Sequence, residues 1–193
     1  MLFRSEGKTT ERTVKLVQVP PSESAYTLHQ ELLNARKFYS KALTGIEQPL
    51  LCEESIPDHT EQYRFLWVPT FDHPIFVRIE IQPDGTAALL SYIWKGQGGY
   101  DWGKPVSSRR KLTSEEQREL FATLTDIGFW TLPAQVENPP NIIVLDGTEW
   151  FIEGVKDSKC HVVTRYSTPL TELFAKQFLE AVAKLKPYNE PVR

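Results

Sequence analysis

The sequence predicts an α+β fold built on a mainly antiparallel sheet of about six strands. Three observations lead to this prediction. Residues 62–111 alternate apolar and polar side chains with the period of two that strands require, and turn residues interrupt them at 71–74 and 83–85. Amphipathic helical patterns follow at 113–127 and 168–186. Strands grouped in meanders, with helices between the groups, are typical of α+β proteins.

Length and charge set limits on the class of protein. The chain has 193 residues and a formal net charge of −3, which suits one domain with an N-terminal extension. A slightly acidic chain gives no electrostatic reason to expect nucleic acid or an anionic membrane as partner. No apolar run approaches the ~20 residues of a membrane-spanning helix, so we expect no membrane insertion.

The cysteines and the first residues bear on the cellular compartment. Cys52 and Cys160 permit one intramolecular disulfide, and their spacing does not decide whether it forms. We expect both to be reduced structural thiols. The N-terminus lacks the apolar segment of a signal peptide, so a cytoplasmic location is the default. A periplasmic location is the alternative if an export signal has been removed.

The N-terminal part of the chain is predicted to be an extension of the main domain. Residues 1–12 are polar and charged, which predicts a disordered tail. Residues 13–60 form the extension, with a short edge strand at 13–19 and an amphipathic helix at 22–45. A single α+β domain is predicted from 61 to 193.

The turn at 83–85 fixes the register of the central strands. Its sequence, Pro-Asp-Gly, favours a type I turn followed by a glycine at positive φ. Such a turn pairs Ile79 with Leu89. A helix is expected to begin after Thr113, because Thr113 and Glu116 have the spacing of a capping box. The strands predicted before this helix are 62–70, 75–82, 87–95 and 106–111.

Both faces of this four-stranded meander are partly apolar. The second face carries Phe76, Tyr92 and Trp94, diluted by Arg78 and Glu80. Either the N-terminal helix covers this face, or the face meets a partner. We favour cover by the chain itself and keep the three aromatic residues as candidate partner-binding residues. The first face is formed by Ile75, Val77, Ile79, Ile81, Leu89 and Ile93.

The last third of the chain predicts a β-hairpin. Residues 148–155 and 160–166 flank a short polar turn, and loops of two or four residues give the same register. That register places Trp150 opposite Arg165, and it puts His161 on the same face of the sheet. The hairpin therefore presents an indole, an imidazole and a guanidinium on one side.

A polar constellation at this hairpin is the one candidate for chemistry. Asp146 precedes the first strand, so its carboxylate could meet His161 and Arg165. Together these groups could bind an anion or transfer protons. The other interpretation is a structural network that holds the hairpin to the final helix, and we favour it. Cys160 points to the opposite face of its strand, which excludes a Cys–His pair.

Two short motifs in this hairpin, DGxxWxxEG and HxVxRYS, carry a resemblance. Their residues are Asp146, Gly147, Trp150, Glu153, Gly154, His161, Val163, Arg165, Tyr166 and Ser167. The motifs resemble the C-terminal hairpin of a group of small, uncharacterised bacterial α+β proteins, in which Trp is usual at the position of Tyr166. The resemblance implies a single structural unit from about Gln62 onward. It implies no catalytic residues, because the group has no established activity.

The glycine-rich loop GQGGYDWG, at 96–103, is a candidate contact loop. Tyr100 and Trp102 at its tip are residue types enriched at protein interfaces. The loop lacks the Lys-Ser/Thr ending of a phosphate loop and precedes a strand rather than a helix. The alternative is a long hairpin loop whose aromatic side chains fold back onto the sheet.

Metal and nucleic-acid sites are not predicted. Asp58-His59 and Asp72-His73 are ligand types in loops, but the spacings HxH, CxxC and HExxH are missing from the sequence. We expect no metal and no cofactor. The basic run at 109–111 is interpreted as a solvated edge strand, because alternation sends neighbouring residues to opposite faces.

The leading functional prediction is a non-enzymatic protein-binding module of accessory, inhibitor or immunity type. Its predicted contact residues are those of the aromatic loop and the second sheet face, and a homo-oligomer stays open. The alternative is a small enzyme or anion-binding protein that uses Asp146, His161 and Arg165. A cleft that contains these three residues would favour the alternative.

Overall fold

The fold is taken from a computed structural model. It describes residues 15–16, 39, 43, 45–48, 50–53, 56, 59–96, 101–134, 147–157 and 159–166. Several predictions fall outside these residues and stay predictions. They are the tail at 1–12, most of the helix at 22–45, the helix at 168–186, Tyr100, Asp146 and Ser167.

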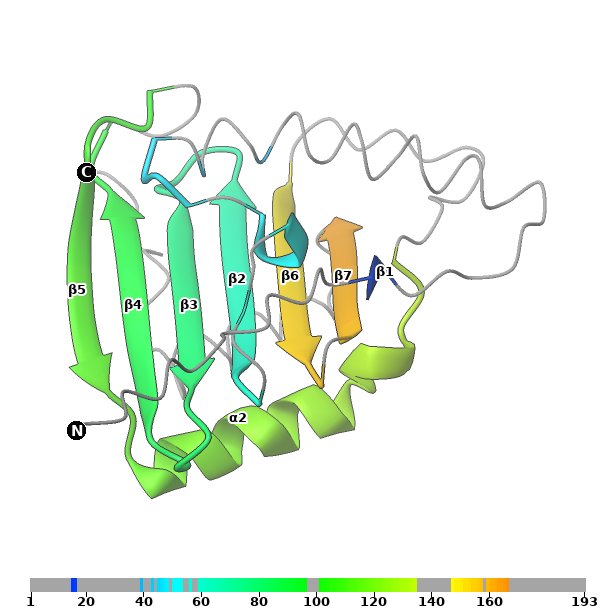
Figure 1. The fold of residues 1–193 in the computed structure, drawn as a ribbon. Helices are drawn as coiled ribbons and strands as arrows, with labels where there is room; N and C mark the ends of the chain where they lie inside the picture. The colour runs from blue at the N-terminus through cyan, green and yellow to red at the C-terminus, as the bar shows by residue number, and fades with distance from the viewer. Residues whose placement is uncertain are drawn as a thin grey trace, which may run out of the picture.

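One mixed sheet forms the centre of the protein, in the strand order β1-β7-β6-β2-β3-β4-β5 (Figure 1). The six longer strands pair antiparallel, and the two-residue β1 adds to β7 in parallel. The α+β class is therefore confirmed. The elements are β1 (Lys15–Leu16), η1 (Leu51–Glu53), β2 (Glu61–Pro69), β3 (Ile75–Ile81), β4 (Ala87–Trp94), β5 (Pro105–Lys111), α2 (Ser114–Asp126), η2 (Phe129–Thr131), β6 (Thr148–Lys156) and β7 (Lys159–Tyr166).

The predicted meander and hairpin are both present, and β2 joins them. β2 pairs with β3 on one side and with β6 on the other. The turn between β3 and β4 has the predicted form, since the Gln82 N–H donates to the Thr86 carbonyl at 2.8 Å. Gly85 has a φ of 80°, and Ile79 pairs with Leu89 as expected. Local turn chemistry therefore fixes this register.

The start and the end of α2 also follow the sequence prediction. The Glu116 N–H donates to Thr113 Oγ1 at 3.2 Å, and the Thr113 N–H donates to Glu116 Oε2 at 2.8 Å. This is the reciprocal capping box. Gly128, at a φ of 63°, follows the helix in the left-handed conformation.

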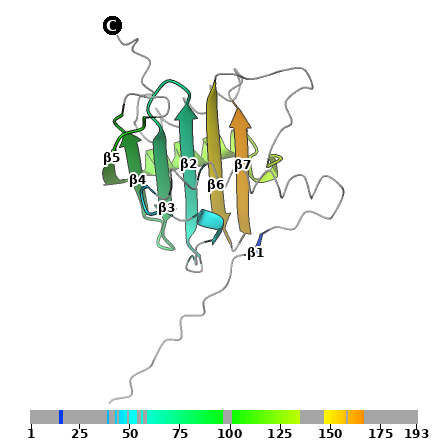
Figure 2. The same cartoon turned by 90° about the horizontal axis from the view of Figure 1, so that it is seen from above.

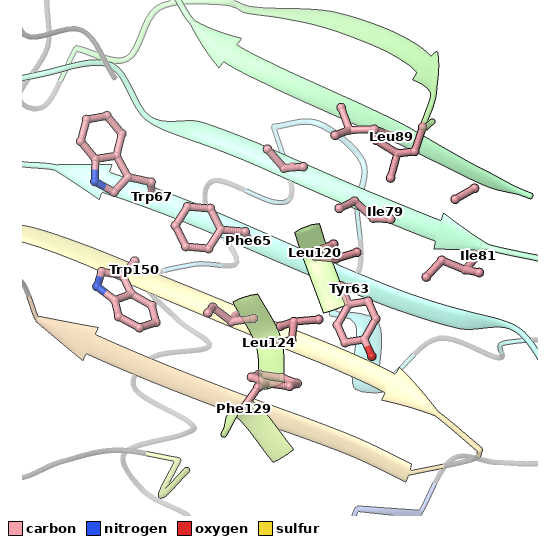
Figure 3. Close-up of a cluster of buried hydrophobic side chains, with 14 of the residues drawn as sticks. Tyr63, Phe65, Trp67, Ile79, Ile81, Leu89, Leu120, Leu124, Phe129 and Trp150 are labelled. Carbon is pink, nitrogen blue, oxygen red and sulfur yellow. The ribbon is translucent and has the colours of Figure 1, made fainter. Parts of the chain in front are cut away.

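The first face of the sheet is buried under α2. Figure 3 shows Leu120 and Leu124 of α2 over the side chains of β2, among them Tyr63 and Phe65. Phe129 of η2 belongs to the same cluster. The other buried members are Trp67, Ile75, Val77, Ile79, Ile81, Ala87, Leu89, Leu112, Trp150, Ile152 and Val163.

The second face is covered by residues that precede β2, as we favoured from the sequence. Tyr39 stacks on Phe151, with ring centroids 4.6 Å apart. Phe76 is 0% exposed and Trp94 is 3% exposed, so neither side chain is accessible to a partner. This burial removes both residues from the predicted contact surface. The remaining members of this cluster are Leu43, Ile46, Leu50, Leu66 and Val68.

A disulfide joins Cys52 of η1 to Cys160 of β7, with Cα atoms 5.6 Å apart. The expectation of reduced thiols is therefore wrong. The physical reason is the placement of η1, which lies on the face opposite α2 (Figure 2). Cys160 points to that face and is buried there beside Leu51 and Val155. Within the described ranges, no helix is long and apolar enough to cross a membrane.

Candidate functional site

The predicted face of the β6–β7 hairpin is present in the structure. Trp150 pairs with Arg165, and Gly154 pairs with His161, so His161 and Arg165 share the face that α2 covers. They lie four residues apart on one strand, which separates their Cα atoms by roughly 13 Å. Asp146 lies outside the described residues. The hairpin alone therefore does not bring His161 and Arg165 to one point.

Arg165 binds backbone carbonyls of the segment that follows η2. Its Nη2 donates to the Pro133 oxygen at 2.7 Å, and its Nη1 donates to the Ala134 oxygen at 3.2 Å. The Thr164 N–H also donates to the Ala134 oxygen, at 2.8 Å. Partial burial lowers the pKa of Arg165. The guanidinium thus holds this segment against β7, and some of its N–H donors are already hydrogen-bonded within the protein.

His161 packs among the aromatic rings of η2. Its ring meets Phe129 edge to face, with centroids 5.1 Å apart, and lies 6.2 Å from Trp130. Gly154 makes room for this packing, because a Cβ at that position would lie 2.6 Å from Phe129 Cε1. Burial lowers the pKa of His161, and the backbone carbonyls of Leu132 and Phe129 partly offset this effect. The ring is therefore mostly neutral at pH 7.

A polar group that the sequence analysis missed lies at the C-terminal end of β6, where Tyr63 pairs with Gly154 on the side opposite His161. The Tyr63 hydroxyl donates to the Glu61 carboxylate, which also binds Lys156 Nζ at 3.2 Å. Burial, and then the neighbouring Glu61, raises the pKa of Tyr63. The hydroxyl therefore stays protonated and acts as a hydrogen-bond donor. No sequence motif marks this group, since its members lie on β2 and β6.

The sequence analysis also missed a buried ion pair between β2 and β6. Arg64 Nη1 lies 3.5 Å from Glu153 Oε2. Glu153 Oε1 accepts the Leu51 N–H at 3.1 Å, and the Arg64 guanidinium carbon lies 6.0 Å from the centroid of the Phe76 ring. The available signal was a charged residue within each of two largely apolar strands, Arg64 in β2 and Glu153 in β6. Together with the disulfide, this pair holds η1 against β6 and β7.

The aromatic loop folds back at its base. Trp102 meets Trp94 edge to face, with centroids 5.8 Å apart. The Gly96 N–H donates to the Trp102 carbonyl at 2.8 Å, and the Gly103 N–H donates to Asp101 Oδ1 at 3.1 Å. Tyr92 is half-buried against Phe76. Trp102 therefore follows the alternative reading, in which the aromatic side chain packs on the sheet.

The edge strand β5 is the most exposed of the six longer strands. Among the described strands it has one neighbour, β4. Val106 is 57% exposed, the side chain of Arg109 is 65% exposed, and Lys111 is also exposed. Pro105 and Arg110 are partly buried, and Nη1 of Arg110 binds Glu116 Oε2 at 2.8 Å. β5 thus presents an accessible edge with positive charge near its end.

The predicted metal-ligand types have other roles or lie outside the description. Asp72 Oδ1 accepts the His73 N–H at 2.7 Å, which is the turn-capping role. Asp58 lies outside the described residues. Among the residues that the structure describes, no three His, Cys, Asp or Glu side chains are grouped to hold a metal ion.

Comparison with protein-family models and with curated proteins gives no relative from which a function could be transferred. No protein-family model matches the sequence, and no curated protein matches it.

Proposed function

We propose that the protein is a non-enzymatic module that binds another protein, in the manner of an accessory, inhibitor or immunity protein. One observation carries this proposal: β5 is a seven-residue strand at the edge of the described sheet, and most of its side chains are exposed. An accessible edge of this length is a template for pairing with a strand of another chain.

The roles of His161 and Arg165 support binding over chemistry. The guanidinium of Arg165 donates to three backbone carbonyls, and the ring of His161 packs against Phe129. Both side chains thus contribute to docking η2 on the hairpin. A site for acid–base work needs groups that converge on one substrate atom, and these two lie apart on one strand.

The disulfide supports a location in an oxidising compartment. Structural disulfides persist in the periplasm and outside the cell, and they are rare in the cytosol. Of the two locations considered from the sequence, the Cys52–Cys160 bond favours the periplasm over the cytoplasmic default.

Affinity capture from the native host tests the proposal. The oxidised chain is immobilised and exposed to host extract, and bound proteins are quantified by mass spectrometry with and without excess free chain. We expect one protein to be enriched at near-equal molar amount and to be displaced by the free chain. Enrichment no greater than on an unrelated domain of similar charge would contradict the proposal.

A further inference from the structure

We propose that β5 is the docking edge and that its occupant is an extended acidic segment of another protein, which adds to the sheet as a further antiparallel strand. This inference rests on the proposed function and specifies both the surface and the chemistry of the partner. Three features of β5 support it: the hydrogen-bonding phase of the strand, the charges beside it and the exposed apolar residue at its start.

The phase of the ladder shows which backbone groups of β5 point outward. The Leu112 N–H donates to the Ala87 carbonyl at 2.9 Å. In an antiparallel pair, hydrogen-bonded positions recur at every second residue, so even-numbered residues of β5 bond to β4. The backbone groups of Ser107, Arg109 and Lys111 therefore point away from the sheet. An added strand would exchange its hydrogen bonds with these three residues.

Pro105 fits the same geometry. It is the first residue of β5 and pairs with Trp94 in an odd-numbered, outward-facing position. A proline has no N–H, so a ladder hydrogen bond would be lost there only on the outer side. The outward edge available for pairing therefore runs from Ser107 to Lys111.

The charges beside this edge are positive. The side chains of Arg109 and Lys111 share the second face of the sheet, because alternate residues of a strand share a face. Arg109 and Arg78 both bind the Glu80 carboxylate, at 3.3 Å and 3.0 Å, so two guanidinium groups share one carboxylate. Lys111 adds a further exposed charge. Acidic residues directly opposite Arg109 and Lys111 would be favoured.

The other face of the edge is apolar at its start. Val106 is exposed, and it pairs with the half-buried Ile93 of β4. An apolar partner side chain beside Val106 would bury the apolar surface of both residues, which is favourable. The expected partner segment thus alternates acidic residues on one face with apolar residues on the other.

A second copy of this chain fits the edge less well. In the two-fold antiparallel registers centred on this edge, hydrogen-bonded partners are Arg109 with Arg109, Ser107 with Arg109, or Arg109 with Lys111. Each of these registers gathers the basic side chains of both copies on one face. Like charges that are opposite or diagonal across a strand pair disfavour pairing. Charge complementarity therefore selects an acidic partner over the chain itself.

The experiment is an NMR titration of the full, oxidised chain with a nine-residue probe peptide. The peptide alternates valine with polar residues, and glutamate occupies two neighbouring polar positions. We expect saturable shift changes confined to β5 and β4, and at least tenfold slower amide exchange at Ser107, Arg109 and Lys111. The same peptide with lysine in place of glutamate should bind at least tenfold more weakly.

Two variants locate the binding. Ser107→Pro removes one outward N–H, and we expect it to weaken binding of the glutamate peptide at least tenfold. Arg109→Gln with Lys111→Gln should weaken it similarly. Arg118→Gln removes an exposed charge from α2 and serves as the matched control with unchanged binding. Unperturbed amide shifts outside β4 and β5 verify that each variant is folded.

Three results would overturn the inference. The first is no response of β5 to the glutamate peptide, and the second is equal binding of the lysine peptide. The third is a set of concentration-dependent shifts in β5 without peptide, which would assign the edge to a second copy of the chain. If the chain captures a partner from host extract but its β5 shows no response to the peptide, only the assignment of β5 as the docking edge is contradicted. Peptide binding without any captured partner would instead contradict the proposed function.

Discussion

Arg64 and Glu153 face each other across the β2–β6 pair as a buried ion pair, each side chain 1% exposed. The pair lies between the sheet and η1, because Glu153 also accepts the Leu51 N–H. Two charges buried in this way constrain each other strongly. Removing one leaves the other without its ion-pair partner in a medium of low dielectric constant.

Arg64→Met is therefore expected to lower the free energy of unfolding by about 3–5 kcal/mol. Combining it with Glu153→Gln should recover a large part of this loss, since glutamine carries no charge and still accepts from Leu51. Urea unfolding followed by circular dichroism measures both. If the double variant were as unstable as the single one, the loss would not come from an uncompensated charge.

Reduction of the Cys52–Cys160 disulfide is expected to destabilise the protein. The bond links residues 108 apart in sequence, and cross-links of this kind stabilise by about 2–4 kcal/mol. Urea unfolding with and without a thiol reductant measures the effect, with the Cys52→Ser/Cys160→Ser variant as the control that should ignore the reductant. If the urea unfolding midpoint did not change although thiol titration showed two free cysteines per chain, the disulfide would have no role in stability.

Stability in acid should depend on Glu116. The hydrogen bond from Arg110 lowers the pKa of this carboxyl from 4.5 to about 2. A carboxylate with a depressed pKa in the folded state stabilises above the unfolded pKa and loses that contribution as pH falls through the folded pKa. Glu116→Gln keeps a capping-box acceptor but removes the charge, so it should cost about 0.5–1 kcal/mol at neutral pH.

The difference between wild type and Glu116→Gln should shrink as pH falls from 4.5 to about 2. Urea unfolding of both proteins over this range measures it. A difference that stays constant across the range would mean that the charge of Glu116 contributes nothing.

His161 should titrate below its ordinary value of 6.5, because burial lowers its pKa. The unfolded chain then takes up this proton first, so stability falls as pH drops below 6.5. NMR titration of the ring gives the pKa, and His161→Phe should remove this part of the pH dependence.

Added phosphate should leave the pKa of the His161 ring unchanged. A rise of the His161 pKa with phosphate would favour the alternative anion site with Asp146 and Arg165.

Local chemistry explains why some of the fold was predictable. The turn at Gly85 and the capping box at Thr113 each involve residues close in sequence, so the pattern itself contains the contact. The hairpin register that separates His161 from Cys160 is local in the same way. These predictions required no knowledge of how distant segments meet.

The unpredicted features join distant segments. Arg64 and Glu153 lie 89 residues apart, and the two cysteines lie 108 apart. Periodicity shows that each strand has two faces, but not which strand lies beside it. For the same reason the aromatic residues Phe76 and Trp94 could be read as an open face, although residues before β2 cover them.

The central claim is that the protein binds another protein through the outward edge of β5. The most direct measurement is capture from host extract by wild type and Ser107→Pro in parallel, with Arg118→Gln as the control. The account predicts one stoichiometric partner retained by wild type and by the control, and lost from Ser107→Pro. Equal retention by all three chains would contradict it.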